Sequence, residues 1–282
     1  SLDLLRDMAP NVKTVVLVVA WFGTDLRCGE CIIEPRVETN TKQTYLADGP
    51  TADNLYVWRA AAITRTTAQL VSYYRGKPAY GGTPNDLSVV RAIQELKSRG
   101  YDVVLYPFIM MDIPEGNTLP NPYSDGAGAV GQATYPWRGR ITCSPAAGHA
   151  GSPDKTGAAA SQVASFVGSA LPAQFGWDGQ TVTFSGTEEW SYRRFILHMA
   201  KLASAAGGVH GFTIGSEMIG MTTVRSGVST YPFVAALKDL AGDARAILGA
   251  GVKIGYAADW SEYHSHRPQD GTGDVHFHLD PL

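Results

Sequence analysis

Short apolar runs alternate with amphipathic stretches along most of this chain. The Val-rich run over 14–21 is bounded by polar residues and Gly23, which is typical of a strand buried on both faces. Similar runs recur towards the C-terminus, each followed by polar or Gly-containing segments. The predicted strands span 14–21, 67–74, 101–110, 209–215 and 252–258.

Helical periodicity fills the intervals between several of these strands. Thr83 stands directly before Pro84, so a capping residue precedes a Pro at the first helical position, and Gly100 is placed to end that helix. Thr187 is the predicted cap of a later helix, with two acids in its first turn. The predicted helices span 84–99, 158–170, 188–206 and 231–248.

A strand followed by a helix and a second strand implies a right-handed parallel crossover, and repetition of this unit predicts an α/β fold of the TIM (β/α)8-barrel type. We expect a single domain over 1–282 with about five such units, and long loop excursions at 25–53 and 114–157. The residues after 258 are too few for three more units of roughly 30 residues each. The barrel is therefore expected to continue beyond Leu282.

Composition excludes some partners. The 282 residues carry a formal net charge of -3, which provides no general attraction for nucleic acid or for an anionic membrane. No apolar run approaches the roughly 20 residues of a membrane-spanning helix. We predict neither nucleic-acid binding nor membrane insertion.

Three cysteines occur, Cys28, Cys31 and Cys143. A zinc or thioredoxin-like site is not expected, because the usual four ligands and the helix after the motif are both missing. The first two follow one predicted strand and the third follows another, so all three are expected on the same face of the barrel. A disulfide joining the two loops is predicted, with free thiols as the alternative.

Acids just after predicted strands are the first candidates for chemistry, because the carboxyl ends of parallel strands form the active site of such barrels. Glu217 is the best placed, and its apolar neighbours are expected to desolvate it and keep it protonated for general acid catalysis. In the structural alternative it caps the next turn or pairs with Arg225.

Other residues near predicted strand ends extend this candidate site. Asp112, Asp259 and Glu262 are the candidates for a second carboxylate, each with a purely structural role as the alternative. Trp21, Trp137 and Trp260 are predicted to stack on sugar rings, or else to belong to the core.

The remaining motifs indicate no cofactor. The histidines at 264, 266, 276 and 278 have weakly specific spacing and no defined third ligand, so solvent-exposed or hydrogen-bonding roles are expected and no metal is predicted. Gly-rich phosphate loops and the Gly-x-Ser-x-Gly elbow do not occur.

Several motifs together resemble the TIM-barrel-like domain of gene transfer agent and phage tail-tip (hub) proteins, and the likeness runs over essentially the whole chain. They are RCGEC at 27–31, YGGTPND at 80–86, YPFIMMD at 106–112, WRGRITC at 137–143 and GSEM at 215–218.

The resemblance implies a glycoside-hydrolase-like barrel in the tail tip of a phage-like particle, assembled in the cytoplasm and released with it. The implied partners are other tail or baseplate proteins and a cell-envelope glycan such as peptidoglycan, which the domain binds or hydrolyses. Glycosidases of the large retaining clan carry Asn-Glu after the fourth strand and a nucleophilic Glu after the seventh. Glu217 matches the acid/base position by strand order, but Ser216 stands where Asn is usual and a seventh strand would lie beyond Leu282. Arg138 and Ser216 complete the predicted substrate-binding set, and a catalytically inactive structural or glycan-binding barrel is the alternative.

Overall fold

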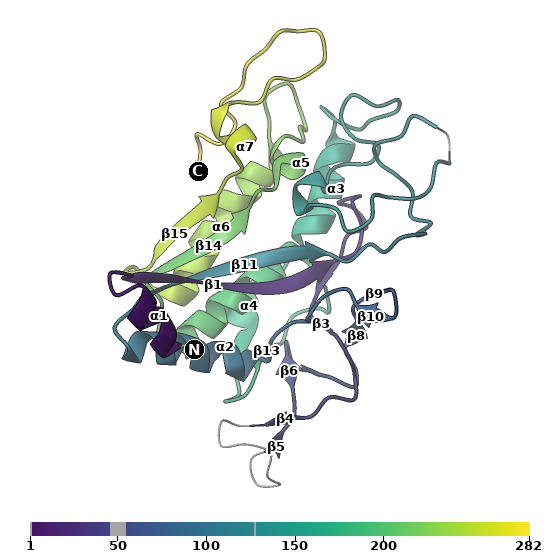
Figure 1. The fold of residues 1–282 in the computed structure, drawn as a ribbon. Coiled ribbons are helices and arrows are strands. Elements are labelled where there is room, and N and C mark those ends of the chain that lie inside the picture. The colour runs from purple at the N-terminus through teal and green to yellow at the C-terminus, as the bar shows by residue number, and fades with distance from the viewer. Residues whose placement is uncertain (1, 46–54, 127) are drawn as a thin grey trace.

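A five-stranded sheet organises the molecule (Figure 1). The computed structural model describes residues 2–45, 55–126 and 128–282. Four strands of the sheet are parallel and one short edge strand is antiparallel. In spatial order they are β15 (Lys253–Ala257), β14 (Gly211–Ser216), β11 (Asp102–Met111), β1 (Thr14–Gly23) and β2 (Ile33–Glu34).

The two longest strands, β1 and β11, pair along their full lengths, from Thr14 with Asp102 to Gly23 with Met111. On β11, buried and partly exposed residues alternate, so one face packs into the core and the other is more open. Val18, on the open face of β1, is 54% exposed. The described strands form an open sheet rather than a closed barrel.

Pro107 lies inside β11, which continues for four more residues to Met111. The reason lies in the pairing with β14, which includes only Val104 and Leu105 of β11. Pro107, which has no backbone N–H to donate, therefore lies beyond the last residue of β11 that pairs with β14. Beyond it the two strands separate, which leaves room for a side chain between their ends.

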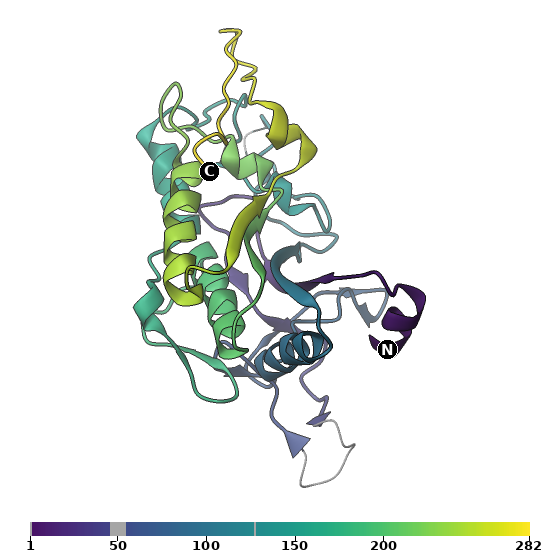
Figure 2. The same ribbon diagram turned by 90° about the vertical axis from the view of Figure 1, so that its left-hand side faces the viewer.

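Helices cover one face of the sheet, and α2, α4 and α6 lie side by side along it (Figure 2). Among the described residues, no helix has the length and apolar character required to cross a membrane. The helices are α1 (Leu2–Met8), α2 (Asp86–Ser98), α3 (Gly157–Val167), α4 (Tyr192–Ala205), α5 (Ile219–Thr222), α6 (Pro232–Leu248) and α7 (Trp260–His264), with 3-10 turns at Arg138–Arg140 and Pro172–Gln174.

Two of these helices begin later than predicted. Asn85, not Thr83, caps α2 by accepting from the backbone N–H of Leu87. The Thr83 hydroxyl instead donates to the carbonyl oxygen of Ala20 and accepts from the N–H of Arg36, so it is used in a tertiary contact. Similarly, α4 is capped by Ser191 rather than by Thr187.

The predicted strand over 67–74 is wrong as a barrel strand. Gln69, Leu70, Tyr73 and Tyr74 are exposed and belong to short pairs outside the main sheet. The excursion between β1 and α2 contains eight two-residue strands besides β2, and its segment 46–54 lies outside the described residues. These strands are β3 (Arg36–Val37), β4 (Thr44–Tyr45), β5 (Leu55–Tyr56), β6 (Arg59–Ala60), β7 (Ile63–Thr64), β8 (Gln69–Leu70), β9 (Tyr73–Tyr74) and β10 (Lys77–Pro78).

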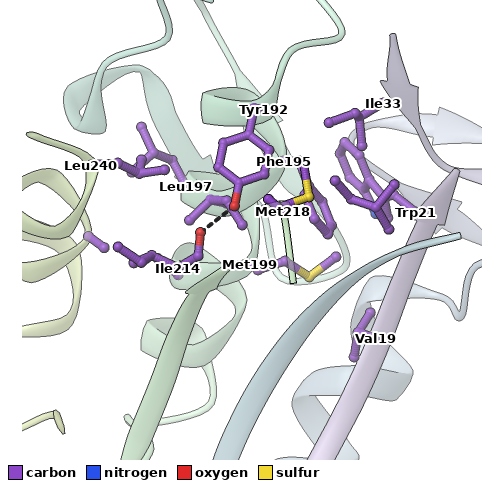
Figure 3. Close-up of a cluster of buried hydrophobic side chains, with 14 of the residues drawn as sticks. Val19, Trp21, Ile33, Tyr192, Phe195, Leu197, Met199, Ile214, Met218 and Leu240 are labelled. Carbon is purple, nitrogen blue, oxygen red and sulfur yellow. Dashed lines mark hydrogen bonds between the residues drawn. The ribbon is translucent and has the colours of Figure 1, made fainter. Parts of the chain in front are cut away.

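A cluster of buried hydrophobic side chains, three of the labelled ones aromatic, fills the space between the sheet and α4 (Figure 3). Trp21 is 0% exposed and packs against Phe195 and His198, so the prediction that it stacks on a sugar ring is wrong. Tyr192 donates a hydrogen bond of 2.7 Å to the carbonyl oxygen of Ile214, which fixes α4 against β14. A hairpin of β12 (Phe175–Trp177) and β13 (Val182–Phe184) precedes α4.

Candidate active site

The candidate site lies where β14 and β15 end. Glu217 directly follows β14 and has a φ of 51°, a left-handed conformation that costs a non-Gly residue about 1–2 kcal/mol. Its backbone N–H donates to the carbonyl oxygen of Ala257, and the next N–H, that of Met218, donates to the Tyr256 hydroxyl. The neighbouring strand therefore holds the turn in which the side chain of Glu217 leaves the sheet.

One oxygen of the Glu217 carboxyl group is held by two donors. Oε2 accepts from the indole N–H of Trp137 at 2.9 Å and from Nη2 of Arg138 at 2.7 Å. The side chain remains 39% exposed, so the expected enclosure by apolar neighbours is not found. Within the described ranges, no hydrogen bond to the other oxygen, Oε1, is found. This oxygen is therefore free to accept a hydrogen bond from a ligand or to donate one to it.

Arg138 occupies the space between the ends of β11 and β14. Its Nε donates to the carbonyl oxygen of Ser216 at 2.8 Å and to the Ser216 hydroxyl at 3.1 Å. Its guanidinium carbon lies 3.9 Å from the centroid of the Phe108 ring, a cation–π contact, and its side chain is 5% exposed. A charge fixed in this way positions the Glu217 carboxylate.

Trp137 is 40% exposed beside that carboxylate. Gly139 lies against its indole ring, where an added Cβ would come within 2.6 Å of the ring. One side of the ring system is thus supported by backbone while part of the indole stays open to solvent. Of the three Trp residues predicted as sugar platforms, Trp137 is the one in contact with Glu217.

Glu262 lies beneath this turn rather than in contact with a ligand. It is 1% exposed and accepts hydrogen bonds from the hydroxyls of Thr222 and Tyr256 and from the N–H of Asp259. Burial raises the pKa of its carboxyl group. The prediction that Glu262 reacts with a substrate directly is wrong for this geometry. It holds Tyr256, which in turn holds Met218.

Asp259 is the partly exposed acid at the neighbouring strand end. It caps α7, and its Oδ2 accepts from the N–H of Ser261 at 2.9 Å and from the Ser261 hydroxyl at 2.5 Å. These hydrogen bonds lower the pKa of Asp259, so its carboxylate is ionised at neutral pH. Because Ser216 pairs with Ala257, Glu217 and Asp259 leave adjacent strand ends, and Trp260 beside Asp259 is 85% exposed.

Other predicted site residues serve the fold. The side chain of Asp112 is 0% exposed and accepts from Nη1 of Arg36 and from the N–H and hydroxyl of Ser72. It therefore attaches the excursion to the end of β11, and the prediction that it lines an open site is wrong. Ser216 is 3% exposed and engaged by Arg138, so it too is turned inwards. Arg225 pairs with Asp154 and Asp270 and not with Glu217.

The cysteines and histidines add no reactive centre. The loops that carry Cys28 and Cys143 lie together, since the N–H of Cys28 donates to the carbonyl oxygen of Thr142. All three thiols are nevertheless free and buried, so the predicted disulfide is wrong. His266, His276 and His278 gather around Tyr231, but no metal-binding group of three or more ligands is found in the described part of the chain.

The order of strands also changes an implication of the resemblance. With 67–74 outside the sheet, β14 is the third parallel strand in chain order and β15 is the fourth. Glu217 therefore follows the third described parallel strand, and Asp259 follows the fourth. The match of Glu217 to an acid/base position after strand four does not hold.

Comparison with known proteins finds one family model that matches the C-terminal third of the chain. Residues 190–282 match the family described as the GTA TIM-barrel-like domain, where GTA stands for gene transfer agent. The mixed α/β fold, with its parallel strands and covering helices, agrees with the description of that family as TIM-barrel-like. Among solved structures, the "Complex structure of GH113 beta-1,4-mannanase" is similar with 14% identity and a TM-score of 0.41, over 93% of this chain and 49% of that chain. This chain thus spans about half the length of that protein, and no curated protein matched.

Proposed function

We propose, for a chain whose residues 190–282 match the GTA TIM-barrel-like domain model, that the strand ends around Glu217 bind a glycan and catalyse its hydrolysis. Glu217 is the general acid/base, and Asp259 is the second carboxylate. Trp137 and Trp260 provide aromatic surface for sugar rings. Arg138 positions Glu217, and Glu262 positions the turn that carries it.

The observation that carries this proposal is the asymmetric environment of the Glu217 carboxyl group. Oε2 accepts from Trp137 and Arg138, while the side chain is 39% exposed. The carboxyl group is therefore fixed in orientation and still accessible, as a general acid must be. A partly exposed indole ring lies directly beside it, where a sugar ring would stack.

The chemistry assigned to the two acids is ordinary glycoside hydrolysis. In its protonated form, Glu217 gives a proton to the leaving glycosidic oxygen as the bond from that oxygen to the anomeric carbon breaks, and the resulting carboxylate is reprotonated from water before the next turnover. Asp259, ionised at neutral pH, acts at the anomeric carbon either directly or by taking a proton from the attacking water. The net reaction adds one water molecule across the glycosidic bond.

Substitution of Glu217 by Gln tests the assignment. The amide keeps the shape but cannot transfer the proton, so we expect glycan hydrolysis to fall by a factor of about 10²–10⁴ while binding persists. Release of reducing ends from purified peptidoglycan by the full-length protein is the measurement. The matched control is Asp239→Asn, an exposed acid on α6, which should leave hydrolysis unchanged. Equal activity of Glu217→Gln and the wild type contradicts the role of Glu217.

A glycan-binding barrel without catalysis is the second candidate, and the Arg138 contact supports it. An ion pair of 2.7 Å holds Glu217 as an acceptor, which is also how a structural acid is held. This candidate expects the wild-type protein to bind glycan without releasing reducing ends. It also expects Arg138→Ala to disturb the turn and weaken binding, with no activity to lose.

We place this domain at the tail tip of a phage-like particle, where it meets other tail or baseplate proteins and the cell-envelope glycan of a recipient cell. In this proposal, the protein is assembled into the particle in the cytoplasm and is released with the particle. The family match to a gene-transfer-agent domain supports this location. Antibody labelling of purified particles should decorate one end of the tail, and label spread over the capsid would contradict the placement.

A further inference from the structure

A second candidate site is a cavity near the end of β11, which the proposed chemistry does not use. Its volume is about 970 Å³, and it is bounded by the β9–β10 hairpin and by the segments around Glu115 and Tyr135. This size is within the range of pockets that enclose a small ligand. Tyr135 lines the cavity, and Trp137, two residues further along, contacts Glu217. The two sites therefore share one short segment.

Aromatic rings form much of the cavity wall. Tyr80 and Tyr135 meet edge to face with centroids 5.6 Å apart. Tyr80 donates to the carbonyl oxygen of Met111, and the Tyr135 hydroxyl lies 3.0 Å from the Ser72 hydroxyl. Burial raises the pKa of Tyr80 to about 12, so it stays a neutral donor. These two rings are fixed, whereas Tyr74 at the rim is 45% exposed.

Cations outnumber anions along this cavity, with Arg75 and Lys77 on the hairpin against Glu115 opposite. The guanidinium of Arg75 lies 5.1 Å from the centroid of the Tyr74 ring. Arg75 and Gly76 have φ values of 50° and 77°, the two left-handed positions of a hairpin turn that Asn-Gly usually fills. An Arg at the first of these positions is conformationally unfavourable, so a Gly there would relieve the backbone.

We propose that this cavity binds a carboxylate-bearing sugar of the glycan whose chain reaches Glu217. The sugar ring stacks on Tyr74, and Arg75 with Lys77 binds the carboxylate. Charge-assisted hydrogen bonds from a guanidinium are among the strongest that a protein makes to a carboxylate. The proposal rests on the glycan-binding function above and names its substrate class as acidic.

The test measures the binding of two defined tetrasaccharides by isothermal titration calorimetry. One alternates N-acetylglucosamine with the carboxylate-bearing N-acetylmuramic acid, and the other is the neutral tetramer of N-acetylglucosamine. All proteins carry Glu217→Gln so that neither ligand is cleaved during the titration. We expect this parent protein to prefer the acidic ligand by about tenfold or more, the factor that corresponds to one such contact.

Arg75→Gly removes the guanidinium and suits the left-handed turn, so this variant should fold well. It should bind the neutral tetramer as the parent does and lose most of the preference for the acidic ligand. Tyr74→Ala should lower the affinity for both ligands by about tenfold. Tyr74→Phe keeps the ring and should bind both ligands as the parent does. Lys238→Ala removes an exposed cation on α6 and is the matched charge control. It should change neither affinity.

Equal affinity for the two ligands, an unchanged preference in Arg75→Gly, or absence of binding overturns the proposal. The outcome is separable from that of the proposed hydrolysis. If binding is selective and depends on Arg75, but the wild-type protein cleaves no glycan, then the proposed acidic-sugar site is supported and the proposed hydrolysis is rejected. If cleavage requires Glu217 but binding is unchanged by substitution of Arg75 or Tyr74, then the hydrolysis is supported and the acidic-sugar site is rejected.

Discussion

At the residue scale, Glu217 depends on a chain of hydrogen bonds that begins in the interior. Glu262 accepts from Tyr256, and the Tyr256 hydroxyl accepts from the N–H of Met218, the residue after Glu217. Each group in this chain is buried or partly buried. The left-handed conformation of Glu217 is therefore maintained by residues that never meet a ligand.

Tyr256→Phe tests this dependence. Without the hydroxyl, the N–H of Met218 loses its acceptor and Glu262 loses a donor, so we expect the protein to lose about 1–3 kcal/mol of unfolding free energy. The turn should also loosen and hydrolysis should fall. Urea denaturation and the reducing-end assay are the measurements. Tyr263→Phe is the control, because Tyr263 is 85% exposed; equal stability of the two variants would contradict the argument.

At the element scale, α4 and β14 are in such close contact that only Gly fits at position 215. A Cβ built on Gly215 would lie 2.0 Å from the hydroxyl oxygen of Tyr192, which bonds the carbonyl oxygen of Ile214. The strand that carries Glu217 is thus held by a tyrosine on the covering helix. Its end is positioned by packing as well as by pairing with β15.

Gly215→Ala should therefore displace Tyr192 and break that hydrogen bond. We expect a loss of about 2–4 kcal/mol, the sum of overpacking and one buried hydrogen bond, measured by chemical denaturation. Gly255→Ala on β15 is the matched control, because a Cβ there meets nothing within 4 Å. A Gly215→Ala protein as stable as this control would show that α4 and β14 are less tightly packed than described.

The segment after α7 should respond to acid. His266 and His276 exchange backbone hydrogen bonds, and burial lowers the pKa of His266 to about 4. The groups around it are Tyr231, His276 and His278, with Arg225 and Asp154 near. Between its ordinary pKa, 6.5, and about 4 the unfolded segment binds the proton more tightly, so stability falls as pH drops through this window.

Hydrogen exchange measures this effect locally. We expect the amides of His266 and His276 to lose protection as the pH is lowered from 7 to 5, after correction for the intrinsic exchange rate, while amides in β11 keep theirs. His266→Phe, which cannot titrate, should reduce the dependence on pH. Protection that is constant over this range would contradict the stated direction of the pKa shift.

At the scale of the whole molecule, one buried ion pair attaches the excursion between β1 and α2 to the sheet. Asp112 at the end of β11 binds Arg36 and Ser72, both of which belong to the excursion. That excursion also provides Tyr74 and Arg75, which line the cavity that we propose binds an acidic sugar. The position of the cavity relative to Glu217 therefore depends on this contact.

Asp112→Ala leaves Arg36 with its other partner, Glu34, but removes the acceptor of Arg36 and of the N–H and hydroxyl of Ser72, so we expect a loss of about 2–3 kcal/mol. Thermal denaturation gives the loss, and limited proteolysis should cut within the excursion first. Glu95→Gln, which breaks an exposed pair with Arg99, should cost about 0–1 kcal/mol. Similar small losses in both variants would contradict the anchoring role.

Local pattern was sufficient for the long elements. The strands β1, β11, β14 and β15 and the helices α2, α3, α4 and α6 all lie close to their predicted ranges. Their apolar periodicity is imposed by burial against the core, so it is visible in the sequence. The run over 67–74 has the composition of a strand but not its burial, and composition alone cannot distinguish the two.

The candidate site was predictable in position but not in its contacts. The sequence by itself determined that acids and aromatic residues follow the strands, because strand ends are set by local periodicity and turn residues. Only the tertiary structure decided that Arg138 rather than Arg225 meets Glu217, that Glu262 is enclosed and that the cysteines are buried free thiols. Those outcomes depend on which distant segments pack together, and that is a property of the whole core rather than of any stretch of sequence.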